Sequence, residues 1–123
     1  MSGQIVKNYS AGGAMTAYRC VKFSAAETVV LAAAATDSII GLATDVAAAS
    51  GERQDVVLHG PALGEAGAAF SLGALLTSDA SGRLVAAAPA AGTNNRVVAI
   101  AHEAASAASD QVRVFVQPGS MQG

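Results

Sequence analysis

The chain has 123 residues, of which 52% are hydrophobic, but 30 of these are alanines that supply little apolar bulk. Seven Lys and Arg against nine Asp and Glu give a net charge of −2 with no basic run, which argues against binding to nucleic acid or to anionic membranes. The length suits a single domain. Because alanine buries little apolar area, we expect a thin core that gains further burial on a partner.

Cys20 is the single cysteine, which excludes an intramolecular disulfide and a cysteine-cluster metal site and fits a reducing compartment. Residues 1–9 carry one lysine and no long apolar stretch, unlike a secretory signal. The longest apolar run, residues 29–35, is too short to cross a bilayer. We expect a soluble protein made in the cytoplasm.

In the first half of the chain, residues 1–10 are predicted to form an extended arm. Residues 21–23 and 29–31 read as a hairpin whose turn, 24–28, lacks glycine and is expected to be loose. In residues 39–43 both alternating sets are apolar, which predicts a strand covered on both faces. Val56 and Leu58 then alternate with outer Asp55 and His59.

The second half repeats this order. Residues 75–77 and 84–86 flank a clear turn at 78–83, residues 97–101 are doubly apolar, and Val112, Val114 and Val116 alternate with polar residues. Residues 11–16 and 29–30 match 66–71 and 84–85 at an offset of 55, while 39–43 and 56–58 match 97–101 and 114–116 at an offset of 58. Alanine stretches at 45–50 and 103–109 are expected to be short helical turns or tight loops.

The predicted fold class is all-β, a compact small barrel or sandwich of the β-tulip kind with at most short helical turns. Its half-repeats span about 11–60 and 66–118 within one β domain, 11–117. The arm 1–10 precedes this domain and a tail, 118–123, follows it.

Cys20, His59 and His102 are the residues that could act as nucleophile or base. The repeat aligns Cys20 with Leu75, a core-type position, and both histidines read as surface or edge residues. Asp45, Glu52 and Asp55 come nearest to a metal cluster but fit a solvated loop. Gly12 and Gly13 do not begin a phosphate-binding loop. We therefore expect no catalytic residue, no metal and no cofactor.

Residues 50–60, 77–85 and 110–116 resemble the head-decoration, or capsid cement, proteins of tailed bacteriophages, and the resemblance covers nearly the whole chain. It implies a virion protein, assembled in the host bacterial cytoplasm, that adds to the outside of the expanded shell. It also implies clamping of neighbouring major capsid proteins, commonly as a homotrimer, without nucleic acid or membrane. The family's first turn usually has an acidic residue and a glycine, and residues 24–28 depart from it because they contain neither a glycine nor an aspartate.

Interface candidates are the N-terminal segment, which could add as a strand to a capsid-protein edge, and the doubly apolar strands. These candidates are Gln4, Ile5, Val6, Lys7, Asn8, Tyr9, Ile40, Leu42, Val98 and Ile100. One alternative is a small non-enzymatic β-barrel that binds host-surface ligands, although the scarcity of aromatic residues counts against it. The other is a small hydrolase that uses Cys20 or a histidine.

Overall fold

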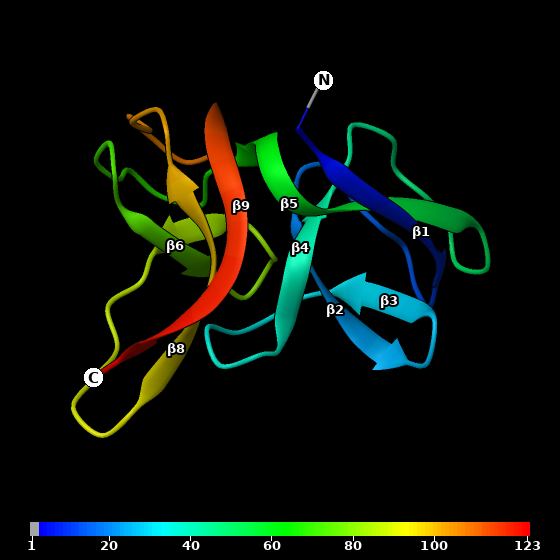
Figure 1. Cartoon of the computed structure of the whole chain (residues 1–123), viewed down its shortest axis with the longest axis horizontal. Helices are drawn as coiled ribbons and strands as arrows, with labels where there is room; N and C mark the ends of the chain where they lie inside the picture. The colour runs from blue at the N-terminus through cyan, green and yellow to red at the C-terminus, as the bar shows by residue number, and fades with distance from the viewer. Residues whose placement is uncertain (1–2) are drawn as a thin grey trace.

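The structure, a computed structural model, describes residues 3–123 and confirms the all-β prediction (Figure 1). Its strands are β1 (Ile5–Ala11), β2 (Cys20–Ala25), β3 (Thr28–Leu31), β4 (Ile39–Ala43), β5 (Arg53–Glu65), β6 (Leu75–Ser78), β7 (Leu84–Ala86), β8 (Asn94–Ala101) and β9 (Gln111–Gln122). Within residues 3–123 there is no helix of the length and hydrophobicity needed to span a membrane.

The first half of the chain forms a closed barrel. The strands follow the order β1-β3-β2-β4-β5, and an antiparallel pairing of β1 with β5 closes the sheet on itself. The barrel interior is a cluster of buried side chains that β-branched and small residues dominate. Its members are Tyr9, Ala11, Met15, Val21, Val29, Ala43, Ala48 and Val56. Closure leaves small residues close-packed inside, which is how an alanine-rich sequence still fills a core.

Strand β5 carries the chain from the barrel into a second sheet. Residues up to His59 pair with β1, whereas those from Gly60 onward pair with β9. Gly60 has a φ of 109°, and a Cβ there would overlap the backbone of Gly3, so the crossing needs glycine. The second sheet continues from β9 through β8 and β6 to β7, and the two sheets form neighbouring lobes on either side of β5 (Figure 1).

The two halves use the same pairing plan. The antiparallel pairs β2–β3, β2–β4 and β4–β5 of the barrel correspond in order to β6–β7, β6–β8 and β8–β9. A parallel contact recurs at an offset of 55, first at Ala11 with Val29 and then at Ala66 with Leu84. In the second half that contact is an isolated bridge, so the second sheet closes less fully than the barrel.

The two predicted hairpins form, but the first turn differs from expectation. β2 and β3 are joined by the two residues between Ala25 and Thr28, so the turn is tight rather than loose. Glu27 adopts a φ of 57°, the left-handed conformation that Gly82, 55 residues later, adopts at 82°. The backbone geometry is therefore reached without the glycine, at a cost of about 1 kcal/mol for a residue with a Cβ.

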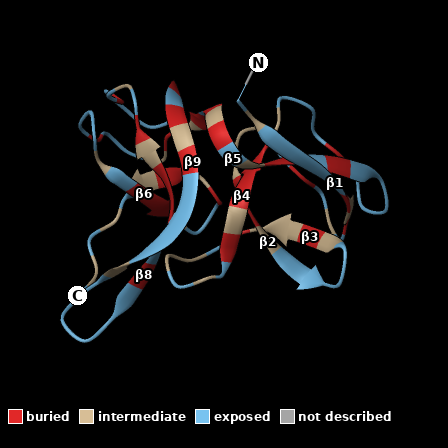
Figure 2. Ribbon diagram, in the orientation of Figure 1, coloured by how far each residue is buried: buried red, intermediate tan, exposed pale blue. Residues whose placement is uncertain are grey.

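The predicted arm and tail are strands in the structure. Residues 5–11 form β1, which is one of the strands of the barrel wall. Residues 1–2 of the predicted arm lie outside the described residues. The tail is the end of β9, which pairs with the start of β8 from Asn94 with Gln122 to Val97 with Gly119. These paired ends form a ribbon that projects from the body and is largely exposed (Figure 2).

The predicted alternation of residues 112–116 and the double coverage of residues 39–43 are confirmed, whereas Ile100 in the second doubly apolar block, 97–101, is only half-buried. Val112, Val114 and Val116 are buried while Gln111 and Arg113 are exposed. β4 is buried at four of its five residues, and its second cover is the other half of the same chain. The alanine stretches at 45–50 and 103–109 are turns and bends without helix, each held by one bridge, Met15 with Ala48 and Phe70 with Ala105.

Candidate functional site

Cys20 and the two histidines do not form a catalytic group. Cys20 is completely buried, and burial raises the pKa of its thiol to about 12, so the reactive thiolate is disfavoured. His59 and His102 are exposed, and both pack on the ring of Phe115, with centroid distances of 5.1 and 5.7 Å. The two histidines therefore pack on either side of a partly exposed aromatic ring.

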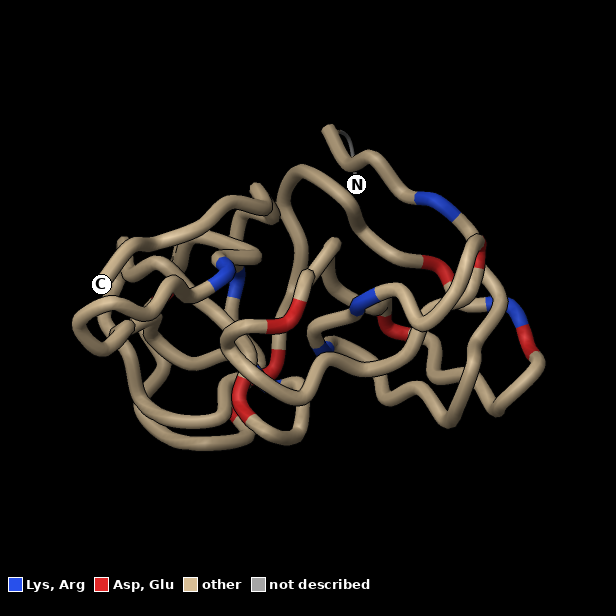
Figure 3. The backbone as a smooth tube through the Cα atoms, turned by 90° about the horizontal axis from the view of Figure 1, so that it is seen from below, with Lys and Arg blue, Asp and Glu red and all other residues tan. Residues whose placement is uncertain are grey.

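Two of the three acidic candidates, Glu52 and Asp55, accept hydrogen bonds from neighbouring groups. A Glu52 oxygen accepts a hydrogen bond from the Ala49 amide, and an Asp55 oxygen accepts one from the Asn8 amide group. Within residues 3–123, no group of three or more His, Cys, Asp or Glu is arranged to hold a metal ion. Lys, Arg, Asp and Glu are spread along the molecule rather than gathered by sign (Figure 3).

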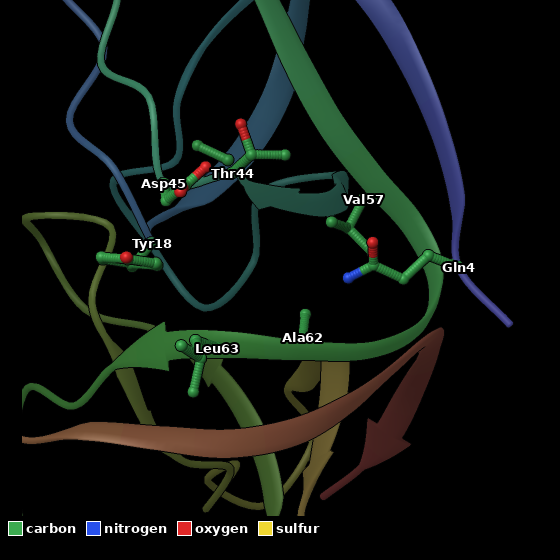
Figure 4. Close-up of a pocket in the computed structure, with 8 residues that line it drawn as sticks. Gln4, Tyr18, Thr44, Asp45, Val57, Ala62 and Leu63 are labelled. Carbon is green, nitrogen blue, oxygen red and sulfur yellow. The ribbon is translucent and has the colours of Figure 1, made fainter. Parts of the chain in front are cut away.

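A hollow of about 250 Å³ lies between the barrel and the later part of β5 (Figure 4). It is lined by Gln4, Tyr18, Ala43, Thr44, Asp45, Val57, Ala62 and Leu63. The Gln4 amide is already used, because its Nε2 donates to the carbonyl oxygen of Pro61 at 2.6 Å. The remaining polar groups are a carboxylate, a phenol and the Thr44 hydroxyl, and the lining contains no histidine, cysteine or lysine that would make a typical nucleophile and base pair.

The junction between the halves is partly ionic. Arg19 Nε lies 3.4 Å from Glu65 Oε1, and Arg83 Nη1 lies 3.8 Å from Glu65 Oε2. The Cys20 amide donates to the Gly82 carbonyl at 2.7 Å, and the Glu65 amide donates to that of Tyr18 at 3.0 Å. Backbone bonds of this kind fix the halves relative to each other, so the surface formed by both is a rigid one.

The N-terminal candidates lie on β1, which has one paired and one largely open edge. Residues Ile5 to Ser10 pair with β5, but on the opposite edge only Ser10 and Ala11 pair with β3. Ile5 is 58% exposed and Val6 44%. Lys7 and Asn8 are also exposed and Gln4 is half-buried. The exposed part of β1 therefore offers apolar side chains beside backbone groups that a further strand could bind.

Three predicted interface residues are buried within this chain. Leu42 and Val98 are fully buried because each side chain packs into the core that the two halves share. Tyr9 is buried because its ring fills the barrel and meets Phe23 edge-on, with centroids 5.3 Å apart. For Leu42 and Val98, the second apolar face is therefore covered by the chain itself. Ile40 and Ile100 are half-buried.

Sequence reasoning named only Ile100 from an apolar row on the outer face of the second sheet and missed its two neighbours. Leu75 lies opposite Ile100, and Ile100 opposite Phe115. We call these three residues the open row. Leu75 is 36% exposed, against the expectation of a core-type position. The signal was present in the repeat, which places bulky Leu75 and Phe115 where the first half has Cys20 and Val57.

The equivalent row of the barrel is closed off. Cys20 lies opposite Leu42, and Leu42 opposite Val57, at offsets of 55, 58 and 58 from the open row. We call Cys20, Leu42 and Val57 the covered row, because they are 0%, 0% and 3% exposed and belong to the core cluster of the second half. One row is thus an interface inside the chain, whereas its counterpart is partly exposed, with Ile100 and Phe115 half-buried.

Comparison with known proteins identifies the group to which this architecture belongs. The solved N base of head fiber gp8.5 of bacteriophage phi29 is similar in fold, with a TM-score of 0.68 and 19% identity over 93% of this chain and 94% of that one. No curated protein matches the chain. The family described as "Phage cement protein" matches residues 1–116. The chain therefore belongs to the phage cement protein family.

Proposed function

We propose that this protein is a structural cement of the phage head, which binds the outer surface of the expanded shell and clamps neighbouring major capsid proteins. The observation that carries the proposal is the match of residues 1–116 to the cement family. A capsid-associated structural role follows from that family. The plain chemistry of the surface agrees with it, because a cement acts by contact and not by turnover.

The physical mechanism is preferential binding. A protein that binds the expanded shell and not its precursor stabilises the expanded state by mass action. Many copies, each making modest contacts, strengthen the whole shell because every copy joins neighbouring subunits. The rigid junction between the halves supports this role, since a clamp must resist movement of the subunits that it joins.

We assign the shell contact to the open edge of β1. An extended capsid segment could add to this edge as a further strand, with backbone hydrogen bonds for affinity and Ile5 and Val6 for apolar contact. The sequence led us to expect the N-terminal segment to add as a strand to an edge of the capsid protein. In this proposal the direction is reversed, because β1 stays paired in the barrel and the capsid protein supplies the added strand. The salt bridge of Lys7 to Glu27, at 3.5 Å, lies beside this edge and is exposed.

The test is co-sedimentation with empty expanded and unexpanded shells. The wild-type protein is expected to pellet with expanded shells only, and Ile5→Lys with Val6→Lys is expected to abolish that binding. Val46→Lys is the matched control, because Val46 is 66% exposed and lies on the loop between β4 and β5, not on β1 itself. Equal binding to both shell forms, or to neither, would refute the cement role. Undiminished binding by the β1 variant would refute the assignment of the edge.

A further inference from the structure

The ribbon formed by the start of β8 and the end of β9 projects from the second sheet, and the common plan of the two halves does not account for it. At the offset of 58, the residues equivalent to 94–96 are 36–38, which form a loop in the first half and not a strand. The match to the family ends at residue 116, before the part of β9 that enters the ribbon. The ribbon is therefore an addition that neither the repeat nor the family match explains.

One face of the ribbon borders a polar hollow of about 530 Å³. Arg96 and Ser120 lie directly opposite each other on the two strands, so their side chains share a face. The loop between β3 and β4 reaches the same hollow. The lining residues are Thr36, Asn94, Arg96, Pro118, Gly119 and Ser120. The lining described here thus offers a guanidinium, an amide and two hydroxyl groups, and it contains no carboxylate.

The guanidinium of Arg96 has little to bind within the chain. Of the seven Lys and Arg side chains, all of which lie in residues 3–123, five form ion pairs with Asp or Glu, and Arg53 donates hydrogen bonds to Asn8 and Ser10. Arg96 forms no ion pair with those residues, and its side chain makes one long hydrogen bond, from Nη1 to Ser38 Oγ at 3.4 Å. A guanidinium carries five N–H donors, so most of them remain available to a partner.

The surroundings of Arg96 hold it in place without neutralising it. Asp37 lies on the loop that borders the hollow, but its carboxylate is bound by Lys22 Nζ at 3.0 Å and by the Ala33 amide at 2.8 Å. The Arg96 amide donates to the Ala35 carbonyl oxygen at 2.7 Å, which ties the ribbon to this loop. Both walls of the hollow are thus fixed before a partner binds, and this lowers the entropic cost of binding.

The donors of the hollow fit a carboxylate. A planar guanidinium donates two parallel hydrogen bonds to the two oxygens of a carboxylate, and neighbouring hydroxyl and amide groups can complete its hydrogen bonding. A phosphate ester carries nearly two negative charges, whereas Arg96 is the one basic residue of the lining. Nucleic acids and anionic membranes bind groups of several basic residues. A single aspartate or glutamate side chain is therefore the ligand of matching charge.

We propose that the hollow beside Arg96 binds an aspartate or glutamate side chain of the major capsid protein. This inference rests on the proposed cement role and names a second contact with the shell. The ribbon and β1 lie toward opposite ends of the molecule (Figure 1). A clamp needs two separate contacts, so β1 can hold one capsid subunit while Arg96 holds its neighbour, and the two contacts reinforce each other through avidity.

The first test measures the affinity for expanded shells by co-sedimentation over a range of protein concentrations. Arg96→Glu is expected to weaken binding by roughly tenfold or more, because it removes one partner of an ion pair and brings like charges together. Arg113→Glu makes the same charge change on an exposed residue of β9 outside the hollow, and it should bind like the wild type. Far-UV circular dichroism checks that each variant is folded. Equal affinity of Arg96→Glu and the wild type would overturn this inference alone, whereas a wild type that binds no expanded shells would overturn the cement role as well.

The second test asks which group the capsid protein supplies. Arg96→Lys keeps the positive charge and adds a primary amine, which a water-soluble carbodiimide can join to a carboxylate in direct contact as an amide. Mass spectrometry of the digested complex with expanded shells should show position 96 linked to an Asp or Glu of the capsid protein. Arg113→Lys provides the control amine and should form no such link. Shell-bound Arg96→Lys protein without a link at position 96, or equal linking of the two variants, would overturn the assignment of a carboxylate.

Discussion

The covered and open rows make a direct comparison of stability possible, because Leu42 and Ile100 occupy equivalent strand positions. Leu42→Ala removes three carbons from a fully buried site, worth about 2.4 kcal/mol at about 0.8 kcal/mol per carbon. The cavity left between barrel and second sheet adds to this, so the expected loss in the free energy of unfolding is about 3 to 4 kcal/mol.

Ile100→Ala also removes three carbons, but its side chain is half-buried. Water can fill the space left, so no cavity cost arises, and the expected loss is about 1.2 kcal/mol. Equilibrium unfolding in urea at low protein concentration measures both. With a slope near 1.5 kcal/mol/M, the midpoint should fall by about 2 M for Leu42→Ala and about 0.8 M for Ile100→Ala. Equal shifts would refute the reasoning, because the two rows would then be equally covered.

Three further predictions concern single positions. Gly41→Ala should destabilise the barrel strongly, because a Cβ there would overlap the carbonyl oxygen of Val57, whereas Gly119→Ala, with open space around it, should change the urea midpoint little. Burial raises the pKa of the Cys20 thiol to about 12, so this thiol should resist iodoacetamide at pH 8 in the folded protein and react only on unfolding. Mass spectrometry measures the labelling, and rapid labelling of the folded protein would contradict the burial. The Ala33 amide and Lys22 hold the pKa of Asp37 below its ordinary value of 3.8, so this carboxylate stabilises the fold above that pH and its contribution is lost as pH falls through the folded pKa. Asp37→Asn should therefore lower stability at neutral pH and flatten the acid side of the stability curve, and an unchanged curve would refute the linkage.

Periodicity predicted the strands well because alternation and turn chemistry are local. The valines of β9 and the turn at 78–83 are examples, and both appear where expected. The duplication stays a proposal; it is supported by pairings that recur at offsets of 55 and 58. Tyr9 and Gly64, at equivalent positions, show how similar halves can still pack differently.

The candidate surface was harder to predict, because the burial of an apolar strand depends on whether the other half of the chain packs against it. Leu42 and Ile100 have nearly the same local sequence, yet Leu42 is fully buried and Ile100 is only half-buried. The arm was missed for a similar reason. Its pairing partner is β5, about 50 residues away, and no local pattern states that an alternating N-terminal segment closes a barrel.

The central claim is that this protein stabilises the phage head, and the most direct test is the thermal disruption of expanded shells that lack it. Adding the purified protein at saturation should raise the disruption temperature of those shells, and the Ile5→Lys with Val6→Lys variant should leave it unchanged. The Val46→Lys control should act like the wild type. Shells that bind the wild-type protein and still disrupt at the same temperature would contradict the account.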